Sequence, residues 1–155
     1  MRKLPVGYLK ALGQVQATMS LAENGLVFSL QSITGYDRET TVCLVGGGSL
    51  KDLAFRISRL VHSRIKRNDD LLKEFDECFE DLRDLYELRN EYTHSLWLRD
   101  GKKVLRLKYS REWRNLFKRD PNITPDVLKK FVVDLEIATN KLMKMIGDNS
   151  SLLKK

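Results

Sequence analysis

The sequence predicts an all-α fold, a bundle of four or five helices with one small β-hairpin inserted after the longest acidic helix. Two observations lead to this prediction. Apolar residues recur at intervals of three and four over most of the chain, which is the spacing of one helix face. A short segment around Asp100 and Gly101 alternates apolar and polar residues instead, beside a strong turn signal. The 155 residues suffice for one domain, which we expect at residues 1–147, followed by a flexible tail at 148–155.

Glycines and capping residues indicate where the helices in the N-terminal two thirds of the chain begin and end. Gly35 marks the turn after the first helix, and the three glycines that begin at Gly46 end the second. Ser49 is a favourable N-cap for the third helix, and Asp52 completes a capping-box pattern with it. We expect these helices at residues 5–32, 38–45, 49–66 and 69–95.

Two further helices are predicted after the hairpin. Ser110 can cap a short helix that runs to about Lys118. Thr124 caps the last helix, in which Pro125 suits the first position because proline lacks the N–H that a helix start leaves unused. Gly147 is the predicted stop signal of this helix.

Composition narrows the class of protein. No apolar run approaches the roughly 20 residues of a membrane span, and the N-terminus lacks the apolar stretch of a signal peptide. Cys43 and Cys78 are isolated, which is typical of buried, reduced thiols. These features predict a cytoplasmic protein. With two histidines in the chain, we expect neither a catalytic transition-metal site nor a cofactor.

The net charge of +7 is unevenly distributed. Residues 69–91 hold ten carboxylates against three cations, whereas residues 99–119 hold nine cations against two carboxylates, with aromatic residues interleaved. Such a basic segment suits a phosphate backbone and unstacked bases, although a solvated basic surface over ordinary core aromatics explains the pattern equally well. The candidate RNA-binding residues are Lys102, Lys103, Arg106, Lys108 and Arg111.

Three polar side chains interrupt the apolar side of the predicted fourth helix. Because a helix turns about 100° per residue, Arg89 falls at the centre of the stripe that begins at Leu71, and Asn90 and His94 fall at its edge. An unpaired buried charge is destabilising, so Arg89 needs a partner, a wet cleft or an interface. Glu23 shares the apolar face of the first helix and is the predicted partner, which leaves a purely structural pair as an alternative.

The segment YELRNEYTHSLW, from Tyr86 to Trp97, resembles the Arg-x(4–6)-His motif of the HEPN superfamily. Arg89 and His94 are its two ends, and Asn90 matches the polar residue that often follows the arginine. HEPN domains are four- or five-helix bundles in which the motif lies near the end of a long helix. The resemblance therefore implies a HEPN-like bundle with a small β-hairpin after the motif helix.

The wider sequence is also similar to this superfamily. LAENGLVFSLQSITG resembles its first-helix segment with the embedded Glu23, GGGSLKDLAFRISRL resembles the start of a middle helix, and HSLW resembles the small residue and Trp that follow the His. The similarity covers most of residues 6–146. One departure is Leu96, which stands where one HEPN toxin group carries a tyrosine that its antitoxin modifies. Silencing by that modification is not expected here.

Many HEPN domains are metal-independent endoribonucleases, and many act as toxins or phage-defence effectors. The resemblance implies that Arg89, Asn90 and His94 are catalytic, with Glu23, Tyr86 and Trp97 in support. RNA supplies its own 2′-hydroxyl nucleophile, so cleavage needs a proton carrier such as histidine and a cation such as arginine on the phosphate.

The two ends of the motif point about 140° apart on one helix, so a single copy makes a poor site. Two copies that face each other across a twofold axis would surround one phosphate, and the resemblance implies such a homodimer. The expected partners are thus an RNA substrate, a second copy, and an antitoxin or inhibitor protein, without a membrane. The alternative function is a non-catalytic HEPN-like module that binds RNA or a partner protein.

Overall fold

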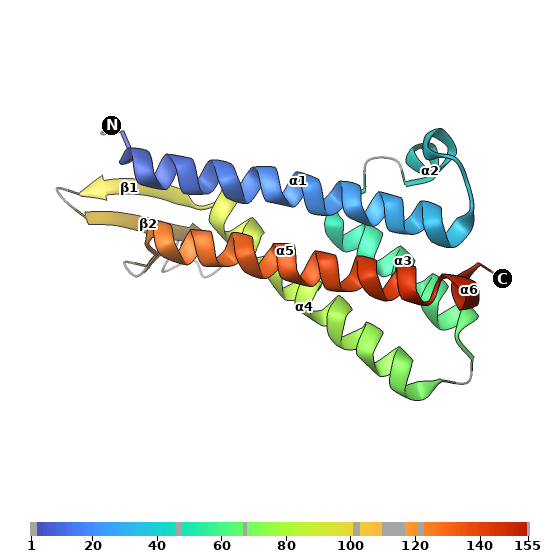
Figure 1. Ribbon diagram of the computed structural model, residues 1–155. Helices are drawn as coiled ribbons and strands as arrows, with labels where there is room; N and C mark the ends of the chain where they lie inside the picture. The colour runs from blue at the N-terminus through green and yellow to red at the C-terminus, as the bar shows by residue number, and fades with distance from the viewer. Residues whose placement is uncertain are drawn as a thin grey trace.

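The structure is a computed structural model that describes residues 3–45, 48–66, 68–100, 103–109, 117–120 and 123–154. Its helices are α1 (Val6–Thr34), α2 (Arg38–Val45), α3 (Leu50–Arg64), α4 (Asp69–Thr93), α5 (Pro125–Asp148) and α6 (Ser150–Leu153). Its strands are β1 (Leu96–Asp100), β2 (Lys103–Tyr109) and β3 (Phe117–Asp120). The predicted all-α fold with a small β insertion is confirmed (Figure 1). None of the described helices combines the length and apolar character that a membrane crossing requires.

The core lies between α1, α5, α3 and α4. Helices α1 and α5 run side by side in the same direction (Figure 1), and α4 returns along them. Their close approach uses Gly25, because a Cβ at this position would lie 2.9 Å from Sδ of Met143. The largest fully buried side chains are apolar: Met19, Leu26, Ile33, Leu50, Leu53, Ile57, Phe75, Leu82, Leu128, Leu135, Leu142 and Ile146.

The capping box predicted at the start of α3 is present in the structure. The Ser49 hydroxyl accepts a hydrogen bond from the backbone N–H of Asp52 at 3.3 Å, and the Asp52 carboxylate accepts one from the Ser49 N–H at 3.1 Å. The Ser49 hydroxyl also donates to this carboxylate, and this bond, followed by the one from the Ser49 N–H, lowers the pKa of Asp52. The capping box therefore fixes where α3 begins.

The sheet is antiparallel, in the order β1-β2-β3, and it lies where α4 ends and α1 begins (Figure 1). Leu98 pairs with Leu105 across the predicted hairpin. The third strand was not predicted from sequence. The short helix expected at 110–118 is wrong at its end, because Phe117 and Lys118 belong to β3, and residues 110–116 lie outside the described part of the chain.

The end of the last helix lies close to the predicted stop at Gly147, since α5 ends at Asp148. Residues 150–153, which the sequence analysis expects in a flexible tail, form the helix α6. Leu153 is fully buried and its carbonyl accepts a hydrogen bond from Arg64, which ties the tail to the bundle. Cys43 is exposed on α2, whereas Cys78 is buried as predicted, and burial raises the pKa of its thiol.

Candidate functional site

The motif residues lie on the last turns of α4. The helix ends at Thr93, and His94 is its C-cap, with a backbone N–H that donates to the Asn90 carbonyl at 3.0 Å. The Thr93 hydroxyl donates to the Arg89 carbonyl at 3.0 Å, a side-chain bond back to the preceding turn of the helix. Arg89, Asn90 and His94 are therefore brought to one end of the bundle, beside the sheet.

Two neutral side chains hold the Arg89 guanidinium. Its Nη1 donates to Oδ1 of Asn90 at 2.9 Å, and its Nη2 donates to Oε1 of Gln16 on α1 at 3.1 Å. The Nε atom is buried and has no hydrogen-bond partner in the described part of the chain. The arginine is half-buried, so its charge is partly removed from water, and none of the described carboxylates forms an ion pair with it.

Glu23 does not pair with Arg89, which corrects the sequence expectation. Its Oε1 accepts a hydrogen bond from the backbone N–H of Leu50, the first residue of α3, at 3.3 Å. Carboxylates are favourable there because the N-terminus of a helix carries unpaired N–H groups and partial positive charge. Glu23 thus joins α1 to α3, and Arg89 meets α1 about two turns earlier, at Gln16.

The His94 side chain is exposed at the end of α4. Within the described residues, no hydrogen bond or ion pair occupies its ring nitrogens. A ring with free nitrogens can accept or donate a proton to a bound molecule, which is what general acid–base catalysis requires.

The two aromatic residues predicted to support the motif are structural. Trp97 donates from Nε1 to the Tyr92 carbonyl at 2.9 Å, and its ring lies 6.2 Å from that of Tyr8 on α1. Tyr86 is half-buried and packs against the core from α4. Trp97 therefore ties β1 to the end of the motif helix.

Arg106 cannot serve as the predicted RNA contact, because its side chain is 2% exposed. Its guanidinium lies over the ring of Tyr92, 5.2 Å from the centroid, and its Nη1 lies 3.5 Å from Oε2 of Glu91. Lys103 is exposed and can contact solvent anions. Lys102, Arg111 and the side chain of Lys108 lie outside the described part of the structure.

Sequence reasoning missed two residues, Gln16 and Tyr92. Gln16 stands seven residues before Glu23 and therefore on the same flank of α1, so helical spacing could have identified it. Tyr92 is 3% exposed and packs edge-on against Phe131, 5.5 Å between ring centroids. Tyr92 contacts α5, Arg106 and Trp97 at once, and it holds the sheet against the bundle.

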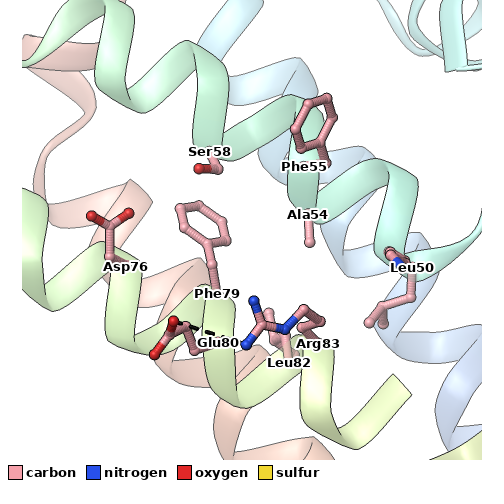
Figure 2. Close-up of a pocket in the computed structure, with 10 residues that line it drawn as sticks. Leu50, Ala54, Phe55, Ser58, Asp76, Phe79, Glu80, Leu82 and Arg83 are labelled. Atoms are coloured by element: carbon pink, nitrogen blue, oxygen red, sulfur yellow. Dashed lines mark ion pairs between the residues drawn. The ribbon is translucent and has the colours of Figure 1, made fainter. Parts of the chain in front are cut away.

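A separate groove lies between α3 and α4 (Figure 2). Phe79 lies in it, Phe55 is 61% exposed at its edge, and Arg83 lies 3.9 Å from Glu80 on its lower side. Beside it, His62 on α3 contacts the Asp76 carboxylate at 2.7 Å, so this histidine joins the two helices. In the described ranges, no three His, Cys, Asp or Glu side chains gather in a way that could hold a metal ion.

Comparison with family models, curated proteins and solved structures found no match for this chain. A proposal for its function therefore rests on the motif, on the position of the motif at the end of α4, and on the surroundings of Arg89 and His94.

Proposed function

We propose that this protein is a metal-independent endoribonuclease of the HEPN type that acts in the cytoplasm. The observation that supports this proposal most is the state of Arg89, a half-buried cation whose described side-chain partners are both neutral amides. His94 follows five residues later with an exposed ring, whose nitrogens bind no group in the described part of the chain. A planar cation and a free imidazole are the two groups that cleavage through the RNA 2′-hydroxyl needs.

In the proposed reaction, His94 transfers protons and Arg89 stabilises negative charge. An imidazole of His94 removes the proton of the 2′-hydroxyl, whose oxygen attacks the adjacent phosphorus as the bond to the 5′-oxygen breaks. A protonated imidazole, at the second His94 of a dimer, gives a proton to the leaving 5′-oxygen. Arg89 stabilises the negative charge that builds up on the phosphorane oxygens. The products are a 2′,3′-cyclic phosphate and a 5′-hydroxyl.

The proposed site is shared by two copies of the chain. On one copy, the side chains of Arg89 and His94 leave α4 in different directions, so a facing copy completes the ring of groups around one phosphate. Such an enzyme would suit a toxin or phage-defence effector controlled by an inhibitor protein. Asn90, which already accepts from Arg89, orients the cation within this site.

The decisive experiment combines EDTA with analysis of the product ends. Purified protein is expected to cleave mixed RNA at the same rate with and without EDTA, because Arg89 supplies the positive charge that a metal ion would otherwise bring. Mass spectrometry should detect 2′,3′-cyclic phosphate and 5′-hydroxyl ends. A 5′-phosphate with a 3′-hydroxyl, or activity lost in EDTA, would instead indicate a two-metal nuclease.

The lysines of the basic segment are expected to contribute to RNA affinity and to take no part in the cleavage chemistry. Replacing Lys102, Lys103 and Lys108 with alanine should reduce the slope of log affinity against log salt by roughly 0.7 per lost phosphate contact on single-stranded RNA. The cleavage rate at saturating RNA should stay the same. Filter binding at several salt concentrations measures the slope, and an unchanged slope would contradict a role for these lysines.

A partner-binding module without catalysis is the second candidate function. The α3–α4 groove favours it, because Phe55 and Phe79 present apolar surface there beside charged rims (Figure 2). A protein that remains monomeric and leaves RNA intact under all tested conditions would favour this module over the nuclease.

A further inference from the structure

The contact between Gln16 and Arg89 joins two elements that are distant in sequence. Gln16 lies on α1 and Arg89 near the end of α4, 73 residues later. A guanidinium carries only donors, so the glutamine must turn its carbonyl oxygen toward the arginine, where Oε1 accepts at 3.1 Å. Asn90 presents its own Oδ1 to the other terminal nitrogen. Both neighbours therefore orient the cation by acceptor atoms alone.

Neutral acceptors leave the electrical charge of the arginine in place. A carboxylate at the position of Gln16 would form an ion pair and compete directly with any anion for the same guanidinium. A glutamine of nearly the same shape accepts one hydrogen bond and adds no negative charge. These two bonds use two of the five N–H donors of the arginine, so three remain, one of them on the buried Nε.

We propose that Gln16 is a positioning residue that fixes the Arg89 guanidinium for an incoming phosphate while leaving its charge uncompensated. The inference deepens the proposed function, since the phosphate would be that of the RNA backbone, but the property itself concerns any phosphate. A glutamate at this exposed position is expected to form an ion pair with Arg89, which contributes little stability at a surface. Glutamine instead keeps the hydrogen bond and leaves the arginine charge available to an anion.

Three variants separate the positioning role from a merely structural one. Gln16→Glu keeps the shape and an acceptor but adds a negative charge, and Gln16→Ala removes the acceptor. Gln14→Glu is the matched control, because it makes the same change in net charge on an exposed position of α1 that faces the groove beside Pro125. Each protein is titrated with inorganic phosphate while the NMR signal of the Arg89 Nε–H is followed, with Arg89→Lys used to assign that signal.

The proposal predicts opposite changes in stability and in phosphate binding. Gln16→Glu should raise the melting temperature, yet weaken phosphate binding at Arg89 by roughly tenfold. Gln16→Ala should weaken binding by about threefold through the lost hydrogen bond, and Gln14→Glu should change it little. Equal phosphate binding in the wild type and Gln16→Glu would overturn the proposal.

The same proteins are then assayed for RNA cleavage, which keeps the two hypotheses apart. If phosphate binding follows the predicted series but none of the proteins cleaves RNA, the positioning role of Gln16 stands and the nuclease proposal fails. If the wild type cleaves RNA and Gln16→Glu cleaves it with an unchanged KM and kcat, the positioning role fails and the nuclease proposal stands.

Discussion

Replacing His94 with alanine is expected to lower the rate of RNA cleavage by about 10²–10⁴, the usual contribution of a general acid or base. The imidazole is exposed at the end of α4 and holds no described structural contact, so the fold should be unaffected. RNA affinity should persist, because the phosphate-binding charges supply most of it. Single-turnover cleavage rates and filter binding, measured on the same preparation, test both statements.

The chain provides a matched control in its other histidine. His62 lies on α3 beside Asp76, with 45% of its side chain exposed, and takes no part in the proposed site. His62→Ala should cleave RNA at the wild-type rate. Equal losses in both variants would contradict a catalytic role for His94. Sedimentation of the wild type as a monomer only, at micromolar concentration, would contradict the shared site.

Replacing Tyr92 with alanine is expected to reduce the free energy of unfolding by about 3–5 kcal/mol, the usual cost of truncating a buried aromatic side chain. The ring lies within the motif but faces inward, where it packs against Phe131 and beneath the Arg106 guanidinium. Its loss leaves a cavity and removes the surface on which that buried cation rests. Chemical denaturation monitored by circular dichroism measures the change.

Tyr92→Phe separates packing from the hydroxyl. The ring remains, so the variant should lose no more than about 1.5 kcal/mol, the upper value for a single neutral hydrogen bond. Its cleavage rate should match that of the wild type, because the tyrosine positions the sheet and does not touch the phosphate in the proposed mechanism. A large loss of rate in a stable Tyr92→Phe protein would instead assign the hydroxyl a part in the chemistry.

The positions of the long helices follow from the sequence because their signals are local. Apolar spacing and caps depend on residues within one or two turns, so the limits of α2 and the capping box of α3 could be predicted without the rest of the fold. The same holds for the hairpin formed by β1 and β2. The end of α5 lies one residue beyond the predicted stop at Gly147, but α6 was missed because its burial of Leu153 against the bundle is a tertiary contact.

The unusual character of Arg89 was also evident from sequence, since a charge at the centre of an apolar stripe requires an explanation. The residue that binds Arg89 was not evident from the sequence. Gln16 and Glu23 lie on one flank of α1, and only the axial position of α4 against α1 decides which of them meets the arginine. That position depends on the packing of the whole core, as does the burial of Arg106 over Tyr92. The sequence by itself therefore determined the long helices, the hairpin and the motif, whereas tertiary packing decided which side chains hold the cation and whether Arg106 is buried.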